Sequence, residues 1–319
     1  MTRYIVRRVI IAVPTLIAIS MVVFTILALA PGDPLSEFAN NPAVPPQVRQ
    51  NIRKNLGLDD PIPVRYAKWF RQVVQGDFGY SFRSRSPVLD LIKMRLPTTL
   101  YVIGTAYLIS ILIAIPIGVL SAVKQYSVFD NVATTIAFIG FSLPTFFTGL
   151  LLIIVFSVKL GWLPSIYRST INTPGLLGVW ERVEQAIMPI AVLALFQSAS
   201  LMRYVRASML ETIHLDYVRT ARAKGLPGRA VITRHAMRNA LIPVVTIIAL
   251  GVPAVFTGAV VTEQIFRVPG IGSLLITAIY DSDTPVVMAI TFIFAVLIVV
   301  FNLIADVIYG VLDPRIKYS

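Results

Sequence analysis

Hydrophobic positions along this chain of 319 residues gather into six long runs, and polar segments separate them. An apolar run of about 18 residues or more is long enough to cross roughly 30 Å of hydrocarbon as an α-helix. The pattern therefore predicts an all-α integral membrane protein with six transmembrane helices, at about residues 9–30, 97–123, 132–158, 186–202, 240–262 and 285–305.

The first run has features of both an anchor and a signal peptide. Three arginines precede it, and the tripeptide at 28–30, Ala-Leu-Ala, is similar to a signal-peptidase site. At about 22 residues the run is longer than the roughly 7–15 of a signal core. We expect an uncleaved anchor, with a cleaved signal peptide as the alternative.

The segment after the first run is polar and rich in proline. It holds ten Lys/Arg and six Asp/Glu, and it reads as a small extramembranous domain. The expected organisation is a tail and first helix at 1–30, this domain at 31–96, a core of five helices at 97–311, and a C-terminal tail at 312–319.

Basic residues set the expected orientation. Three arginines precede the first helix, and eight Lys/Arg accompany only two acidic residues in the loop 203–238. Lys and Arg favour the cytoplasmic side in short flanks. We therefore expect this loop and both termini in the cytoplasm. The basic segment 31–96 then lies outside, which is acceptable because loops longer than about 60 residues cross largely regardless of charge.

Composition supports a membrane location and excludes several kinds of chemistry. Hydrophobic residues make up 56% and charged residues 14%, mean hydropathy is +0.77, and the net charge is +12. Because the positive charge lies between apolar runs, a lipid surface or a docking protein is a better partner than nucleic acid. With no cysteine and two histidines, disulfides, thiol catalysis and a histidine-rich metal site are excluded.

The chain carries no energy source that can be recognised in its sequence. It has no phosphate-binding loop of the G-x-x-x-x-G-K-[ST] type and no H-E-x-x-H motif. The second to fifth predicted spans have no charged residue in their interiors, whereas ion-coupled carriers keep ionisable groups there. If the chain transports a substrate, the energy should therefore come from a partner protein. The alternative kinds of protein are an ion-coupled carrier and an ATP-independent channel.

Two predicted spans contain clusters of glycine, proline and small polar residues. In the third span the cluster includes Ser142, Pro144 and Thr145, and in the fifth it includes Thr257. One interpretation is a neutral path in which prolines permit bends beside a cavity. The other is close helix packing through small residues, which needs no path. The sequence leaves both open.

The cytoplasmic loop predicts two short helices joined by a sharp turn. Leu210, Tyr217 and Ala221 recur at helical spacing on one face. Gly225 suits a helix C-cap, where a positive φ costs glycine little, and Pro227 suits the start of the next helix. The basic residues alone are explained by cytoplasmic retention and anionic lipid. The elbow shape, with a small residue in the middle, also suits a groove on another protein.

Several motifs, in order, resemble those of bacterial ATP-binding-cassette importers of the dipeptide/oligopeptide type, specifically the first of their two permease subunits. The similarity covers essentially the whole chain. It is carried by DYVRTARAKGL (216–226), RHAMRNALIP (234–243), LAPGDP (29–34), LGLDDPIPVRY (56–66), GDFGYSF (76–82), SLPTFF (142–147), GWLPS (161–165), EQIFRVPGIG (263–272) and DPRIKY (313–318).

This resemblance implies a type I importer permease whose cytoplasmic loop docks on an ATPase. Importer permeases carry a Glu-Ala-Ala-x-x-x-Gly loop; Gly225 matches its glycine and Ala221 its second alanine. Arg219 and Thr220 occupy the positions of the motif's glutamate and first alanine. The sequence does not show which contact replaces that of the glutamate. The expected coupling residues are Asp216, Tyr217, Arg219, Thr220, Ala221, Arg222, Lys224 and Gly225.

The same resemblance implies the partners. They are a homologous second permease chain, two ATPase subunits that bind Mg-ATP, and an extracytoplasmic substrate-binding protein, with no cofactor on this chain and a location in the bacterial cytoplasmic membrane. Peptides are the expected substrate. Nickel chelates, glutathione and oligosaccharides are alternatives, because related permeases share the same architecture.

Two external motifs are further candidates. The segment around Asp77, Phe78 and Tyr80 either contacts the binding protein, entering its cleft to help release substrate, or only covers the permease mouth. The motif that begins at Glu263 is either a gate element or a simple turn. The residues expected at the path or gate are Ser142, Pro144, Thr145, Thr257 and Glu263.

Overall fold

The computed structural model describes residues 2–29, 47, 59–168 and 173–312. Within these residues the chain is helical apart from turns, loops and one isolated β-bridge, between Tyr80 and Pro87. The motif at 29–34, the first half of the predicted domain 31–96 and the tail 313–319 lie largely or wholly outside the described residues.

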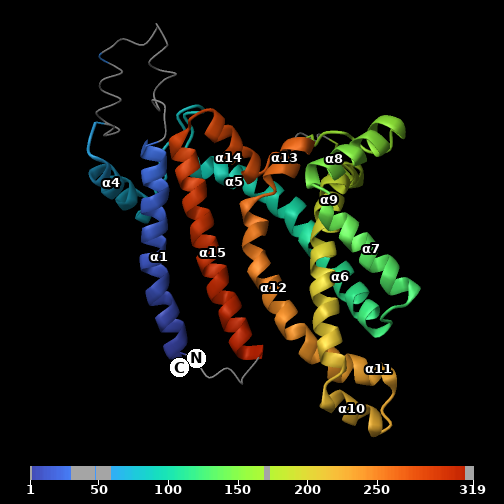
Figure 1. Cartoon of the computed structure of the whole chain (residues 1–319). Helices are drawn as coiled ribbons and strands as arrows, with labels where there is room; N and C mark the ends of the chain where they lie inside the picture. Colours follow the sequence, from blue (N-terminus) through green and yellow to red (C-terminus); the bar gives the residue numbers. More distant parts are fainter. Residues whose placement is uncertain (1, 30–46, 48–58, 169–172, 313–319) are drawn as a thin grey trace.

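The helices are joined mostly by short turns, and three of them include π-helical segments, labelled η (Figure 1). In chain order the elements are α1 (Thr2–Leu29), α4 (Ile62–Val74), α5 (Val88–Thr99), η1 (Leu100–Gly104), α6 (Thr105–Val123), α7 (Val128–Ser142), α8 (Thr145–Leu152), η2 (Ile153–Lys159), α9 (Gly175–Ile213), α10 (Asp216–Ala223), α11 (Gly228–Ala230), η3 (Val231–Ala236), α12 (Met237–Thr257), α13 (Val260–Phe266), α14 (Ile271–Tyr280) and α15 (Thr284–Leu312).

Five helical stretches in the described residues are long and apolar enough to cross a membrane, and a bent pair is a sixth candidate. The five are Ile10–Leu29, Val88–Val123, Gly175–Ile213, Gly228–Thr257 and Thr284–Val307. The prediction of one continuous third span at 132–158 is wrong. The chain breaks after Ser142 and turns through 101° before Thr145, since Pro144 ends α7 and caps the start of α8.

Two predicted boundaries also move. The fourth span was expected to end at residue 202, but α9 continues to Ile213 and carries Arg203 and Arg206 within it. The boundary placed between 96 and 97 falls inside α5, which continues through η1 into α6 despite Pro97. In both cases the prediction placed the end of a span at a charged residue or a proline. The helix continues beyond that residue because it packs on neighbouring helices.

The core of the bundle is built around α9. At one end, buried side chains of α6, α7, α9, α10, η3 and α12 form one hydrophobic cluster. Towards the other end, η1, α6, α9, α12 and α13 form a second cluster, and α5, α14 and α15 form a third. Gly118 allows α6 to approach α9 closely, because a Cβ there would lie 2.7 Å from the Cβ of Val205.

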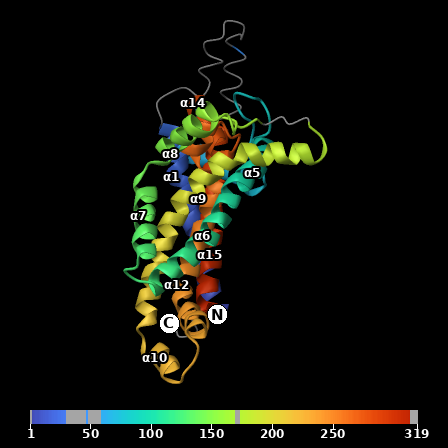
Figure 2. The same cartoon turned by 90° about the vertical axis from the view of Figure 1, so that its right-hand side faces the viewer.

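The two ends of the bundle are distinct in both views. Figures 1 and 2 show α10 at one end, with the start of α1 and the end of α15 at the same end, and α8, α13 and α14 at the other. The start of α1 and the end of α15 therefore lie at the same end of the bundle as α10, and the side of the membrane that this end occupies stays a prediction. The amphipathic α4 packs beside α1 at the opposite end, where Phe24 lies 5.6 Å from both Tyr66 and Trp69 between ring centroids.

Candidate coupling and transport sites

The short helix α10 is held against the end of the bundle by its own apolar face. Val218 and Ala221 are buried in the cluster that also contains Val205 and Val231. The helix starts at Asp216 after a break at His214–Leu215, because Val218 and Arg219 bond back to the carbonyl of Leu215. The elbow is therefore anchored rather than loosely attached.

The turn after α10 confirms the predicted glycine cap. Gly225 has a φ of +74°, in the left-handed region. Its N–H bonds to the carbonyl of Arg222 at 2.9 Å, and the N–H of Leu226 bonds to the carbonyl of Ala221 at 3.4 Å. This pair of bonds is the Schellman arrangement, which satisfies the last carbonyls of a helix. Pro227 then precedes α11, as predicted.

One sequence prediction about this helix needs correction. The sequence predicted one continuous helical face through Leu210, Tyr217 and Ala221. The break before α10 changes the helical phase, so that Val218, and not Tyr217, lies on the buried side of α10. Ala221 faces inward, where its small side chain lets α10 approach η3, and it does not project outward. The exposed side carries Asp216, Tyr217, Arg219, Thr220, Arg222 and Lys224.

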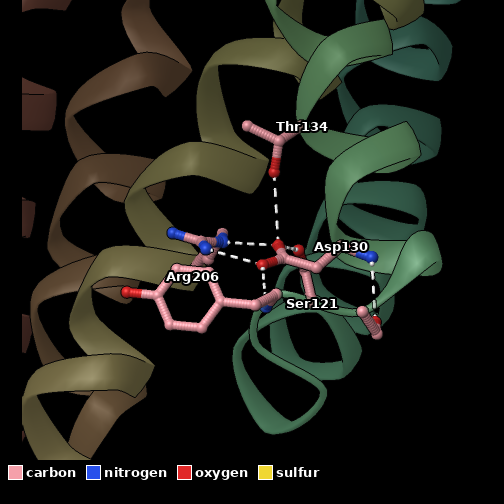
Figure 3. A network of polar contacts seen from close by, with 6 residues as sticks. Ser121, Asp130, Thr134 and Arg206 are labelled. Carbon is pink, nitrogen blue, oxygen red and sulfur yellow. Dashed lines mark hydrogen bonds and ion pairs between the residues drawn. The ribbon is translucent and has the colours of Figure 1, made fainter.

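A buried ion pair that the sequence did not reveal joins α7 to α9 (Figure 3). Arg206 donates from Nε and Nη2 to the two carboxylate oxygens of Asp130, at 2.7 and 2.8 Å. Ser121, Thr134 and the backbone N–H of Tyr126 also donate to this carboxylate. The pair was missed because its members are 76 positions apart. An Asp three residues after a Ser N-cap reads as ordinary helix capping.

The predicted path residues of the third span lie at the break between α7 and α8. Ser142 and Pro144 are exposed on this chain and Thr145 is half-buried. Thr257 ends α12, where its hydroxyl bonds to the carbonyl of Ala254 at 3.1 Å. Gly258 follows with a φ of +84°. The structure thus places these residues at helix ends, where backbone groups leave the helical ladder; their role in a path stays a prediction.

Glu263 is not on a surface of this chain but inside a turn. Its side chain is 1% exposed, and it accepts hydrogen bonds from the hydroxyl of Thr99 at 3.2 Å and from the N–H of Ser273 at 2.7 Å. A Cβ on Gly270 would overlap the Glu263 carboxyl group, so the glycine permits the close approach. Burial raises the pKa of the Glu263 carboxyl above its ordinary value. The motif is therefore a turn built around a carboxyl group.

The motif at 76–82 is held against the loop before α15 by hydrogen bonds. Asp77 accepts from the N–H of Gly79 at 2.8 Å and closes a tight turn. Asp283, which is buried, accepts from the hydroxyl of Ser81 and from the N–H of Phe82 at 3.0 Å. Phe78 packs on the cluster of α5, α14 and α15. Tyr80 is 63% exposed and Asp77 is exposed, so both are available to another protein.

Comparison with known families identifies the chain. Residues 114–318 match the family described as binding-protein-dependent transport system inner membrane component. Residues 1–103 match the N-terminal region described for membrane components of the same systems. The chain belongs to this family. It is therefore a multi-pass membrane component of a transport system rather than an enzyme.

Individual relatives agree over the full length. The chain is 44% identical to the oligopeptide transport system permease protein AppB of Bacillus subtilis, and the alignment covers all of both chains. It is 37% identical to the dipeptide transport system permease protein DppB of Escherichia coli, again over the whole of both. Among solved structures, an amino acid ABC transporter chain gives a TM-score of 0.50 at 16% identity, covering 72% of this chain and 95% of that one, which supports the permease fold.

Proposed function

We propose that this family member is the permease subunit of an ATP-driven peptide importer, forming half of the translocation path and receiving motion from cytoplasmic ATPase subunits through α10. The observation that carries this proposal is the full-length similarity to oligopeptide and dipeptide permeases, together with an anchored elbow at one end of the bundle. The termini and α10 then lie in the cytoplasm, and the end with α13 and α14 faces outward.

The geometry of α10 supports a mechanical role. Its buried face joins the cluster that includes α6, α9 and α12, so a push on the exposed face moves three long helices at their ends. ATP binding by two partner ATPases draws two such elbows together, and differential affinity for the two arrangements shifts the equilibrium between them. Tyr217, Arg219 and Thr220 would supply the contacts, with Arg219 in the place of the family glutamate.

The partners follow the same logic. The second permease chain completes the path at the break between α7 and α8. The exposed Ser142 and Pro144 and the half-buried Thr145 there are accessible to a second chain. A substrate-binding protein docks at the outer end, where Asp77 and Tyr80 are accessible beside the turn that Asp283 holds. Mg-ATP binds the ATPases, and this chain binds no cofactor of its own.

The decisive experiment is purification with reconstitution. The complex should contain two ATPase subunits and a second permease chain, and it should take up a dipeptide in proteoliposomes when ATP and the binding protein are supplied. The ligand retained in the cleft of the binding protein identifies the substrate. A metal chelate or sugar in that cleft would contradict the peptide assignment, and ion-driven uptake by this chain alone would contradict the importer.

The docking role of α10 has a separate test with a matched control. Arg219→Glu should reduce co-purification of the ATPases, because it reverses a charge on the exposed face. Arg71→Glu makes the same change on exposed α4, at the other end of the bundle, and should leave co-purification unchanged. Equal retention of the ATPases in both variants would count against α10 as the docking element.

A further inference from the structure

An arginine of the long helix α9 has no carboxylate partner among the residues that the structure describes. The guanidinium carbon of Arg203 lies 4.1 Å from the ring centroid of Phe141 and 5.5 Å from that of Phe138, both on α7. Its Nε is buried and has no hydrogen-bond partner. Across the described residues, the ion pairs leave Arg203 unmatched. A positive charge in this position requires an explanation.

The place of this guanidinium along the helices makes it unusual. Asp130 lies near the start of α7, and Phe138 and Phe141 lie two to three turns further along it, or about 12–16 Å at the rise of an α-helix. The next arginine of α9, Arg206, is neutralised by Asp130. An ionisable side chain inside a membrane span is costly, and such residues face partners or substrate pathways. Arg203 therefore stands where a partner is expected.

The site is open on the surface of this chain. Phe138 is 53% exposed and Phe141 is 44% exposed, while Phe141 stacks on Phe196 at 5.8 Å between centroids. The adjoining residue, Ser142, is exposed and lies where α7 breaks. The aromatic rings attract the cation through their faces and hold the guanidinium beside this break. The arginine is thus held in place beside an exposed surface of the chain.

We propose that Arg203, on its platform of Phe138 and Phe141, is a binding site for a carboxylate of the transported substrate, namely the C-terminal carboxylate of a peptide. A guanidinium presents N–H donors in a planar fork that matches a carboxylate. The surrounding candidates for the path, such as Ser142 and Thr145, are neutral and offer no comparable anchor. This inference rests on the proposed peptide importer and adds to it the group by which the permease recognises its substrate.

A carboxylate from the second permease chain has the same chemistry, so the test must separate the two sources. The complete importer, with its ATPases and binding protein, is reconstituted in proteoliposomes. Maximal uptake rates are measured for a dipeptide and for its C-terminal amide, each at a concentration that saturates the binding protein. Arg203→Gln should lower the rate for the dipeptide about tenfold, the size expected for one charge-assisted hydrogen bond. The rate for the amide should change less than twofold.

Two further variants make the result specific. Arg203→Lys keeps the charge but loses the fork, and it should restore part of the dipeptide rate. Tyr204→Phe removes a polar group from the next, exposed residue of α9, and it should alter neither rate. Basal ATP hydrolysis should be equal in the parent and in Tyr204→Phe.

The overturning outcomes are distinct. An equal loss for dipeptide and amide in Arg203→Gln would assign the arginine to the second permease chain or to folding. Unchanged rates for both would remove any role in recognition. Failure of the unmodified complex to take up either peptide, with another substrate transported, would overturn the proposed function itself and this site with it.

Discussion

Asp130 and Arg206 tie α7 to α9 through two parallel hydrogen bonds, and Asp130 is 1% exposed. Ser121, near the end of α6, donates to the same carboxylate, so three helices meet at one charged group. α9 ends two turns later and leads directly into α10. The pair therefore links the elbow to α6 and α7 by a rigid, directional contact, in addition to apolar packing.

The effects of removing the two members of this pair should not be additive. Asp130→Asn leaves a guanidinium without its counter-charge and should lower the free energy of unfolding by about 3 kcal/mol. Arg206→Gln should have a comparable effect. The double variant should be less destabilised than the sum of the two, with a coupling of about 2 kcal/mol. Thermal unfolding of the four proteins in one detergent measures the cycle, and strictly additive effects would contradict a direct interaction.

Two helix glycines offer a matched test of packing. A Cβ at Gly118 would lie 2.7 Å from the Cβ of Val205 and 2.9 Å from the carbonyl of Met202, so Gly118→Ala must push α6 away from α9. At Gly140 the Cβ would meet Ala199 at 3.5 Å, an ordinary contact. We expect Gly118→Ala to destabilise by about 1–3 kcal/mol and Gly140→Ala to be neutral or stabilising by up to about 1 kcal/mol. Melting temperatures check both, and equal values would contradict the close approach.

Gly225 should be sensitive to backbone conformation alone. A Cβ there meets nothing within 4 Å, so any penalty arises from its φ of +74°. Gly225→Val should insert normally yet lose uptake and substrate-stimulated ATP hydrolysis, because a β-branched residue adopts the left-handed region only at a cost.

Gly225→Asn is the matched control for that variant. Asparagine tolerates the left-handed conformation and should retain most of the coupling. Substrate-stimulated ATP hydrolysis that is normal in Gly225→Val, or lost equally in both variants, would show that coupling does not depend on the left-handed conformation of residue 225.

Glu263 should make stability depend on pH in a defined direction. Burial raises the pKa of its carboxyl, so the folded state holds the proton more tightly than the unfolded chain. Its stabilising contribution is complete below the ordinary glutamate pKa and is lost as pH rises through the higher folded pKa. The difference in unfolding free energy between the parent and Glu263→Gln should therefore fall as pH rises through that window. Thermal unfolding of both proteins between about pH 4 and 8 measures it; a difference that grows with pH would contradict the sign.

The membrane-spanning character of the chain and the approximate positions of most of its long helices could be predicted, because a helix that crosses lipid needs a long apolar run, which is a property of the local sequence. The glycine cap at Gly225 could be predicted for a similar reason, since the left-handed conformation is a property of one residue and its neighbours. Pro144 was recognised as permitting a bend, but not as ending a helix and starting another at 101°.

The buried groups could not be predicted in the same way. Asp130 was not singled out in the sequence, and Glu263 was expected in a gate element or a simple turn. Only the packing of distant helices gave them Arg206 and Thr99 as partners. Arg203 was taken as the end of a span because charge is unfavourable in lipid. In the folded chain α9 continues beyond Arg203, whose guanidinium lies beside aromatic rings of α7.

The sequence by itself determined the class of protein, the transmembrane pattern and the turn of the elbow, because these depend on hydrophobicity and backbone preference within a few residues. The tertiary structure decided which face of α10 is exposed, that Arg206 pairs with Asp130, and that Arg203 lies against aromatic rings of α7. Those properties depend on contacts between segments far apart in the chain, and electrostatic partners inside a membrane protein are chosen by helix packing rather than by sequence spacing.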